Sequence, residues 1–249
     1  LYYCDFIRRS ICTPSRRPTL IPCGARIKGM LVEMRDTRIH SCDVGPLNLY
    51  RWSREMANVD LKKAAFRPLS DEFEIFDLDF YTDGPETGRQ PKELPVPIAR
   101  DGILSAIVVW FDLRLDPETT YSTSPFSAEA THHPQAVMYF NEIKVQAGAQ
   151  IPLVVANHGA ELQFAIDEAQ LHGQEKTTII PLPRYDPRWK EHSDKTQELA
   201  KSLHTRMQVA SEFRAITQAC LKMGIQPTNF GLDPQVTSRF CNMFFTSLG

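Results

Sequence analysis

The sequence predicts a mainly β fold with helical additions, in which short antiparallel strands form a sandwich or a barrel. Between residues 69 and 167, apolar residues alternate in short runs that Gly148 and Gly159 help to separate, a pattern typical of antiparallel strands. From 199 to 221, apolar residues recur every three or four positions, which is the spacing of an amphipathic helix. A chain of 249 residues, 42% of them hydrophobic, is long enough for one substantial core and an appendage.

The N-terminal segments predict a helix and then a strand. Residues 1–12 carry apolar side chains at helical spacing before Pro14, so they resemble the end of a helix, and residues 25–34 follow as a strand. Residues 35–66 differ from the strands around them, because they predict short helical turns. Several apolar side chains lie close together in this segment (Leu47, Leu49, Tyr50, Trp52 and Met56). Such an excursion from a sheet either caps a core or docks on a partner.

The remaining elements follow from alternation and from prolines. Strands are expected at 73–80, 103–115, 136–143, 151–156 and 161–166. Three prolines predict a connector at 91–97, and the Pro-rich segment 171–187 is expected to end the β region. The helix at 199–221 is expected to close at Gly224, and a second helix is expected at 234–248.

Composition excludes several classes of protein. A formal charge of -2 provides no global basic field for nucleic acid or an anionic membrane. The longest apolar run, residues 103–111, is far shorter than the roughly 20 residues that a bilayer requires. The six cysteines are scattered without any C-x-x-C pair, so we expect reduced thiols in a cytosolic protein and no metal site. The acidic stretch 71–83 would attract a basic peptide, although a solvated strand face explains it better.

Two neighbouring histidines, His132 and His133, lie in a polar loop before the strand at 136–143. Adjacent side chains point in different directions, so the pair is a poor metal site, and a loop histidine is more often a surface or packing residue. Ser124 has no G-x-S-x-G motif around it. Spacing alone therefore predicts a β-rich domain with a helical tail and leaves its function open.

Several short segments follow one another in a specific order. They are Leu20-Ile21-Pro22, Ala25-Arg26-Ile27, Leu69-Ser70, Phe76-Asp77, Asp79-Phe80, the run from Asp101 to Asp112, Tyr121-Ser122-Thr123-Ser124-Pro125, Thr131-His132 and Gln135-Ala136-Val137. This order resembles the C-terminal half of a protein arginine methyltransferase, in which a Ser-Thr-Ser-Pro segment precedes a Thr-His-Trp loop. The resemblance covers residues 1–167, and the strand with Trp110 is most similar to members that carry two methyltransferase modules in one chain.

The resemblance implies a Rossmann-like domain that binds S-adenosylmethionine and holds the substrate guanidinium with two glutamates, followed by an antiparallel β-barrel that closes the arginine pocket. Residues 1–19 would end the Rossmann-like domain, and residues 20–170 would form the barrel, with a dimerisation arm at 37–65. Residues 171–249 would be a linker and a helical extension. The chain begins with Leu1 rather than Met, so we expect a piece of a longer protein that alone neither binds S-adenosylmethionine nor methylates.

By position, His132 matches the family's loop histidine, and the resemblance implies a catalytic role in which it pairs with an acid and holds the shape of the pocket. Thr131, His133 and Ser124 would contact the substrate. The implied partners are the missing cofactor domain, a second module or a homodimer partner, and arginine-rich proteins, with no membrane and no direct nucleic acid. The expected location is the cytoplasm and also the nucleus.

Two alternatives stay open. His133 and Pro134 stand where the family usually has Trp and Lys, which favours a catalytically inactive scaffold or activating subunit. An unrelated β-sandwich binding domain is the third hypothesis.

Overall fold

The computed structural model describes residues 1–11, 19–39, 42–52, 55–127, 133–158, 161–181 and 222–224. The chain divides into two compact units, one formed by residues 1–34 and 54–179 and the other by residues 35–53 and 180–249. The helices predicted at 199–221 and 234–248 lie outside the described residues. Gly224 has a φ of 69°, the left-handed backbone expected of a residue that follows a helix.

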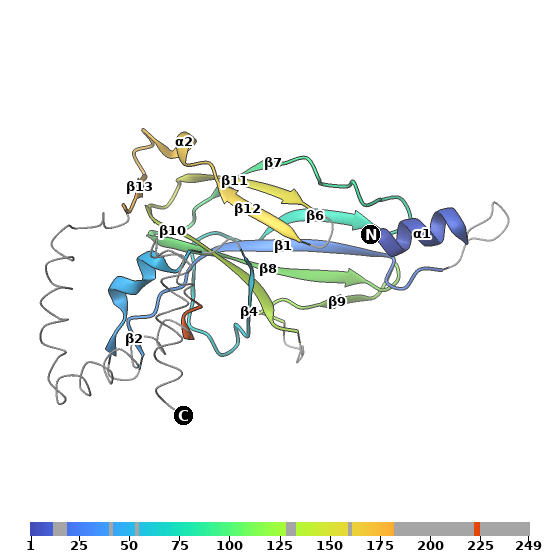
Figure 1. Ribbon diagram of the computed structural model, residues 1–249, viewed down its shortest axis with the longest axis horizontal. Coiled ribbons are helices and arrows are strands. Elements are labelled where there is room, and N and C mark those ends of the chain that lie inside the picture. Colours follow the sequence, from blue (N-terminus) through green and yellow to red (C-terminus); the bar gives the residue numbers. More distant parts are fainter. Residues whose placement is uncertain are drawn as a thin grey trace, which may run out of the picture. The chain divides into compact units, whose positions relative to one another are not determined.

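Antiparallel strands form the framework of the first unit, as predicted (Figure 1). In chain order its elements are α1 (Tyr2–Ser10), β1 (Gly24–Glu33), β4 (Ala57–Val59), β5 (Arg67–Pro68), β6 (Phe73–Asp79), β7 (Lys92–Pro97), β8 (Gly102–Arg114), β9 (Thr120–Ser122), β10 (Gln135–Val145), β11 (Gln150–Asn157), β12 (Leu162–Ile166), α2 (Glu168–Leu171) and β13 (Thr177–Ile179). The N-terminal helix and the six predicted strands are therefore confirmed, with boundaries that differ by a few residues.

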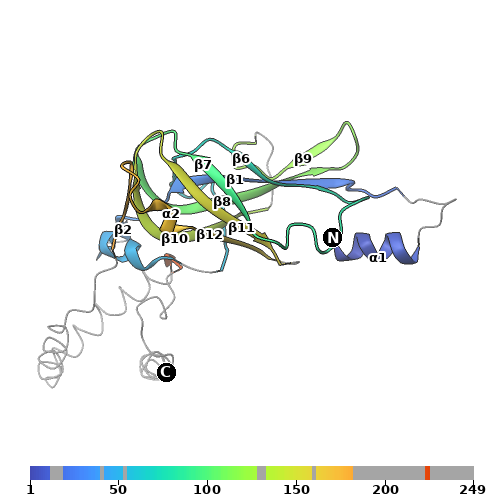
Figure 2. The same ribbon diagram turned by 90° about the horizontal axis from the view of Figure 1, so that it is seen from above.

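These strands form one eight-stranded and one three-stranded sheet. In the larger sheet β8 lies between β1 and β10, and in the smaller sheet β11 lies between β7 and β12 (Figure 2). Among the described strands the pairing does not close into a ring. The mainly β, antiparallel fold is confirmed, and two sheets share the core in place of a continuous hydrogen-bonded barrel.

The main core lies between the two sheets. Leu31, Ile107, Ile151 and Leu153 come from both sheets and are fully buried. The other face of β8 contributes Trp110 and its neighbours to a second apolar cluster, which segment 57–66 covers. Because β8 is buried on both faces, its sequence is a nearly continuous apolar run rather than an alternating one.

Two predictions about where strands end were wrong. Most of the predicted connector at 91–97 forms β7 (Lys92–Pro97), an edge strand that pairs only with β11 among the described strands. Proline is tolerated at such an edge, since the missing N–H would face away from the sheet. The β region also extends past 171, because β13 pairs with β10 at Ile143, Lys144 and Val145.

The second unit contains a short hairpin of β2 (Arg38–Ile39) and β3 (Cys42–Asp43), followed by the 3-10 helix η1 (Gly45–Tyr50). One of the short helical turns predicted within residues 35–66 corresponds to η1. The predicted arm of residues 37–65 also includes β4, which pairs with β10 in the sheet of the first unit. None of the described helices is long and apolar enough to cross a membrane.

Candidate functional site

The loop between β9 and β10 carries the predicted site residues, and Thr123 fixes its first end. The Thr123 side chain is buried and its Oγ1 accepts from the Phe111 N–H at 3.1 Å and donates to the Phe111 carbonyl at 3.0 Å. The Thr123 N–H donates to the same carbonyl at 2.9 Å. The loop therefore leaves the sheet from a defined point beside β8.

Ser124 starts a tight turn immediately after this anchor. The Ser124 carbonyl accepts from the Ser127 N–H at 3.1 Å, and Pro125 occupies the second position, where its fixed φ favours a turn. The Ser124 hydroxyl oxygen accepts from the Phe126 N–H at 3.2 Å. This hydroxyl thus supports the turn, and its predicted contact with substrate stays a prediction.

His133 lies at the other end of the loop and is exposed. The centre of its ring is 6.1 Å from that of Phe111 and 6.3 Å from that of Tyr121, with the Tyr121 ring edge-on. His133 is thus placed beside two aromatic rings at this end of the loop. Thr131 and His132 lie outside the described residues.

Gln135 joins the two ends of the loop, and the sequence did not single it out as a site residue. Its side chain is buried; Nε2 donates to the Thr123 carbonyl at 2.9 Å and to the His133 carbonyl at 3.3 Å. Its Oε1 accepts from the Leu61 N–H at 3.2 Å, which also ties the loop to segment 57–66. The feature of the sequence that could have identified Gln135 was a polar residue at the start of an otherwise apolar strand.

A second polar cluster lies on the sheet beside β9. The Lys28 ammonium is 3.1 Å from a carboxylate oxygen of Asp112 and 3.2 Å from one of Glu72, and the Ser122 hydroxyl donates to the other oxygen of Asp112. Partial burial disfavours the charged ammonium, yet the hydrogen bonds to Asp112 and Glu72 together raise the pKa of Lys28 above its usual value of 10.5. Lys28 is therefore a fixed cation that neutralises Asp112.

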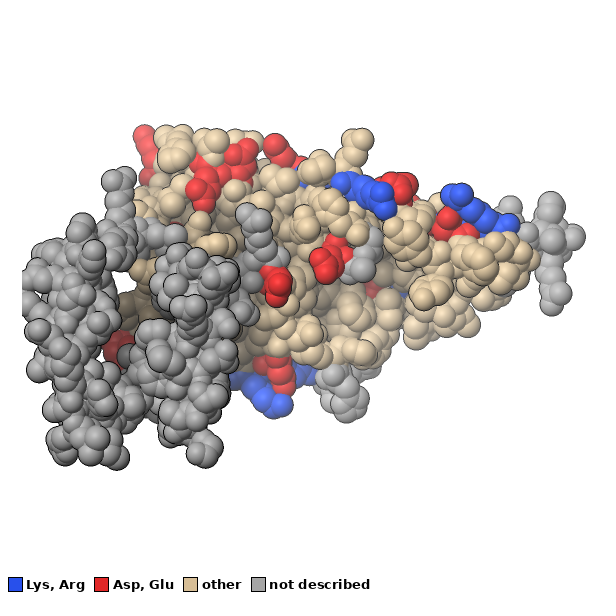
Figure 3. Space-filling view, viewed as in Figure 1, with Lys and Arg blue, Asp and Glu red and all other residues tan. Residues whose placement is uncertain are grey.

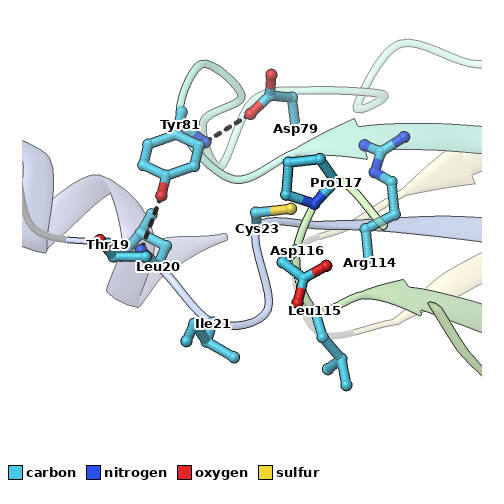
Figure 4. A pocket seen from close by; sticks show the side chains of 10 residues that line it. All are labelled: Thr19, Leu20, Ile21, Cys23, Asp79, Tyr81, Arg114, Leu115, Asp116 and Pro117. Atoms are coloured by element: carbon cyan, nitrogen blue, oxygen red, sulfur yellow. Dashed lines mark hydrogen bonds between the residues drawn. The ribbon is translucent and has the colours of Figure 1, made fainter. Parts of the chain in front are cut away.

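An open hollow of about 450 Å³ lies where β1 begins and where β6 and β8 end (Figure 4). The residues that line it are Thr19, Leu20, Ile21, Cys23, Asp79, Tyr81, Arg114, Leu115, Asp116 and Pro117. The Tyr81 hydroxyl accepts from the Leu20 N–H at 2.9 Å, and Asp79 accepts from the Tyr81 N–H at 2.7 Å.

The described lining of the hollow differs from that of a usual nucleoside-binding site. A nucleoside cofactor is commonly held by a glycine-rich turn whose N–H groups approach it closely, and this lining contains no glycine. The Arg114 guanidinium is also engaged, by the Asp77 carboxylate and, at 2.8 Å, by the Leu78 carbonyl. In the part of the chain that the structure describes, no three His, Cys, Asp or Glu side chains lie close enough to hold a metal ion.

Comparison with known proteins identifies relatives. Residues 41–170 match the family model described as the arginine methyltransferase oligomerization subdomain. The chain is 37% identical over 109 residues to protein arginine N-methyltransferase 9 of Mus musculus, and 32% identical over 111 residues to the Homo sapiens protein of that name. These alignments cover 43% and 44% of this chain, which spans only 12% of the length of either relative.

Among solved structures, the chain is similar to one from the Trypanosoma brucei PRMT1 enzyme-prozyme heterotetrameric complex with AdoHcy. The TM-score is 0.45 at 16% sequence identity, and the match covers 65% of this chain and 56% of that one.

Proposed function

The chain belongs to the protein arginine methyltransferase family, and we propose that it is the substrate-binding and oligomerisation part of a protein that methylates arginine guanidinium nitrogens with S-adenosylmethionine as methyl donor. The match of residues 41–170 to the family's oligomerisation subdomain carries this proposal. Since the chain spans only 12% of the length of its relatives, the activity is proposed for the longer protein to which this part belongs.

The described residues support a positioning role for this part. A guanidinium stays cationic at every working pH, so an arginine pocket needs fixed carboxylates. We assign these carboxylates and the binding of S-adenosylmethionine to a preceding domain, as the family resemblance implies; the described hollow offers no glycine-rich turn for a nucleoside. The loop between Thr123 and Gln135 would close the arginine pocket. The hydrogen bonds that Thr123 and Gln135 make at the two ends of this loop would help to position His132.

Helix α1 supports the proposal that a cofactor domain covers the N-terminal segment. The side chains of Asp5 and Arg8 are 19% exposed, and Arg8 donates to the Asp83 carbonyl, whereas Tyr3 is 85% and Phe6 is 60% exposed. The side of this helix that carries Asp5 and Arg8 thus contacts the first unit, and its aromatic face with Tyr3 and Phe6 points outward. An apolar surface of a preceding domain would cover that face.

The proposed substrates are arginine-rich proteins, and the proposed oligomeric partner is a second methyltransferase module or a second copy. Acidic side chains gather over α2 and β7 (Figure 3), where Glu93 of β7 and Glu168 of α2 are exposed, and they would attract cationic peptides. We place the protein in the cytoplasm and the nucleus. No membrane contact and no direct contact with nucleic acid are proposed.

Two measurements test this function. Calorimetry on the isolated 249 residues is expected to detect no binding of S-adenosylmethionine, and tight binding would contradict the domain assignment. In the longer protein, His132→Ala is expected to lower kcat/KM for an arginine-rich peptide by about 100-fold, because a misplaced pocket loop loses the reactive geometry. His172→Ala removes an exposed imidazole next to α2 and is the matched control, expected to leave kcat/KM unchanged.

The alternative is a catalytically inactive scaffold or activating subunit. The observation that favours it is the pair His133 and Pro134, which replaces the Trp and Lys of the family loop. It predicts that the longer protein lacks methyl transfer of its own, that His132→Ala changes nothing, and that adding the protein raises the activity of a catalytic partner.

A further inference from the structure

Asp112 is a nearly buried carboxylate near the end of β8, and its two oxygens have different partners. The residue is only 9% exposed. The Lys28 ammonium is 3.1 Å from one oxygen, and the Ser122 hydroxyl donates to the other. A carboxylate in such a place costs free energy unless its oxygens have partners. Both oxygens are therefore engaged, and one of them holds the residue that precedes Thr123 and the loop.

Strand pairing places these three side chains on one face of the sheet. Asp112 is directly opposite Ser122 of β9 and opposite Arg26 of β1, so Lys28 lies diagonally across from it. Opposite and diagonal neighbours on paired strands are close enough to interact. The Lys28 ammonium is also 3.2 Å from a carboxylate oxygen of Glu72. Lys28 is thus held on both sides and keeps Asp112 in one position.

The hydroxyl of Ser122 connects Asp112 to Ser124. A serine hydroxyl has a single proton, and Ser122 donates it to Asp112. The Ser122 oxygen is left to accept, and it accepts from the Ser124 N–H at 3.2 Å. The carboxylate therefore fixes the direction of the Ser122 hydroxyl, and this hydroxyl fixes the backbone of Ser124.

The hydroxyl of Ser124 keeps a proton that it can donate. Its oxygen accepts from the Phe126 N–H at 3.2 Å, and among the described residues its proton has no acceptor. Phe126 also anchors the turn, because the centre of its ring is 6.5 Å from that of Trp110 in an edge-to-face contact. Trp110 and Asp112 are two residues apart on β8 and share one face. The turn therefore offers a hydrogen-bond donor at a fixed place.

We propose that Asp112 is a positioning residue that acts through Ser122 on Ser124, whose hydroxyl donates to a backbone carbonyl of the arginine-containing substrate. This proposal rests on the proposed function, which makes the loop part of the substrate pocket. A guanidinium has five donors and no acceptor, so it cannot receive the Ser124 proton, whereas a peptide carbonyl can. The contact therefore holds the substrate backbone and not the reacting side chain.

Steady-state kinetics of the longer protein test this contact. A bond to the substrate backbone exists before and during methyl transfer, so its loss raises KM and leaves kcat unchanged. Ser122→Ala is expected to raise KM for an arginine-rich peptide by about 5- to 10-fold. Ser122→Thr keeps the hydroxyl and is expected to stay within about twofold of the wild type. Ser70→Ala is the control, since it removes a buried hydroxyl that accepts from the Leu31 N–H at 2.9 Å, and it is expected to leave KM unchanged.

Double variants test whether Asp112, Ser122 and Ser124 act in series. Asp112→Asn and Ser124→Ala are each expected to raise KM as well. Combining either of them with Ser122→Ala is expected to raise KM no further than the larger single effect. The proposal would be overturned by effects that multiply, by an unchanged KM in Ser122→Ala, or by a rise in KM for Ser122→Thr that equals that of Ser122→Ala.

Hydrogen exchange in the 249-residue chain tests the positioning without catalysis. The Ser124 amide is expected to exchange about tenfold faster in Ser122→Ala and in Asp112→Asn, because its acceptor is lost or is no longer oriented by a carboxylate. An unchanged rate would overturn the positioning.

The failure of the proposed function gives a different result. If the wild-type longer protein transfers no methyl group, the proposed function is refuted and the exchange rates stay as they are. The same variants are then compared by the dissociation constant of the arginine-rich peptide, where the same fold-changes support the contact and unchanged constants overturn it. The two failures are therefore distinguishable.

Discussion

Replacing Gln135 by methionine tests whether this one side chain holds the loop that carries the site. The substitution keeps the length of the side chain and removes both polar atoms. Gln135 is only 3% exposed, so no water can replace its hydrogen bonds without a rearrangement. Gln135→Met leaves the Leu61 N–H and the Thr123 carbonyl without their partner, and both residues are buried.

The expected loss follows from these two groups. A buried donor or acceptor that loses its partner costs about 1–3 kcal/mol, and the apolar contacts of methionine offset part of the sum. We therefore expect the free energy of unfolding to fall by about 2–4 kcal/mol. The His133 carbonyl adds little, because its bond to Gln135 Nε2 is long at 3.3 Å and His133 is exposed.

Urea unfolding of the 249-residue chain measures this loss as a lower midpoint at an unchanged slope. Gln170→Met is the matched control, because Gln170 is exposed and bonds to Glu93 and Asp167 at the surface. We expect the control to change stability by less than about 0.5 kcal/mol. If Gln135→Met also lowered the free energy of unfolding by less than about 0.5 kcal/mol, the reasoning would be refuted, since the loop would then be held by other contacts.

Three further predictions concern the sheet. Lys28→Met is expected to destabilise the chain at pH 8, because it removes the ion pair with Asp112. Partial burial opposes the Lys28 charge, but the hydrogen bond to Asp112 raises the pKa of Lys28 in the folded state above 10.5. The ion pair therefore stabilises the fold below the pKa of the unfolded state, and this stabilisation is lost as the pH rises through the folded-state pKa. Urea unfolding between about pH 8 and 12 should show the gap to wild type closing, and a constant gap would exclude the ion pair as its cause. Gly29→Ala is expected to cost about 1–3 kcal/mol in thermal unfolding, because overpacking is costly and a Cβ there would lie 2.8 Å from Ile75 Cδ1; an unchanged Tm would contradict this. Leu153→Ala is expected to cost about 2–5 kcal/mol by calorimetry, as it empties space between the two sheets, and a loss below about 1 kcal/mol would mean that the core refills.

The periodicity of apolar residues predicted the mainly β fold and most strands, because one buried face imposes a period of two on each strand. It failed at residues 91–97, where three prolines indicated a connector. Whether proline can occupy a strand depends on whether its missing N–H faces a neighbour, and only the pairing of β7 with β11 answers that. The prediction also failed after residue 171. There β13 is too short to show a period of two, and its pairing with β10 makes it a strand.

The sequence by itself determined the family resemblance, the order of the segments and the place of the loop that carries His132, because these depend on residue types and spacing along the chain. Only the tertiary structure decided that Gln135 joins Thr123 to His133 and that Arg51 donates to the Met223 carbonyl. The periodicity of the sequence cannot predict these contacts, because a hydrogen bond depends on the distance between two groups in space and not on their separation in the sequence.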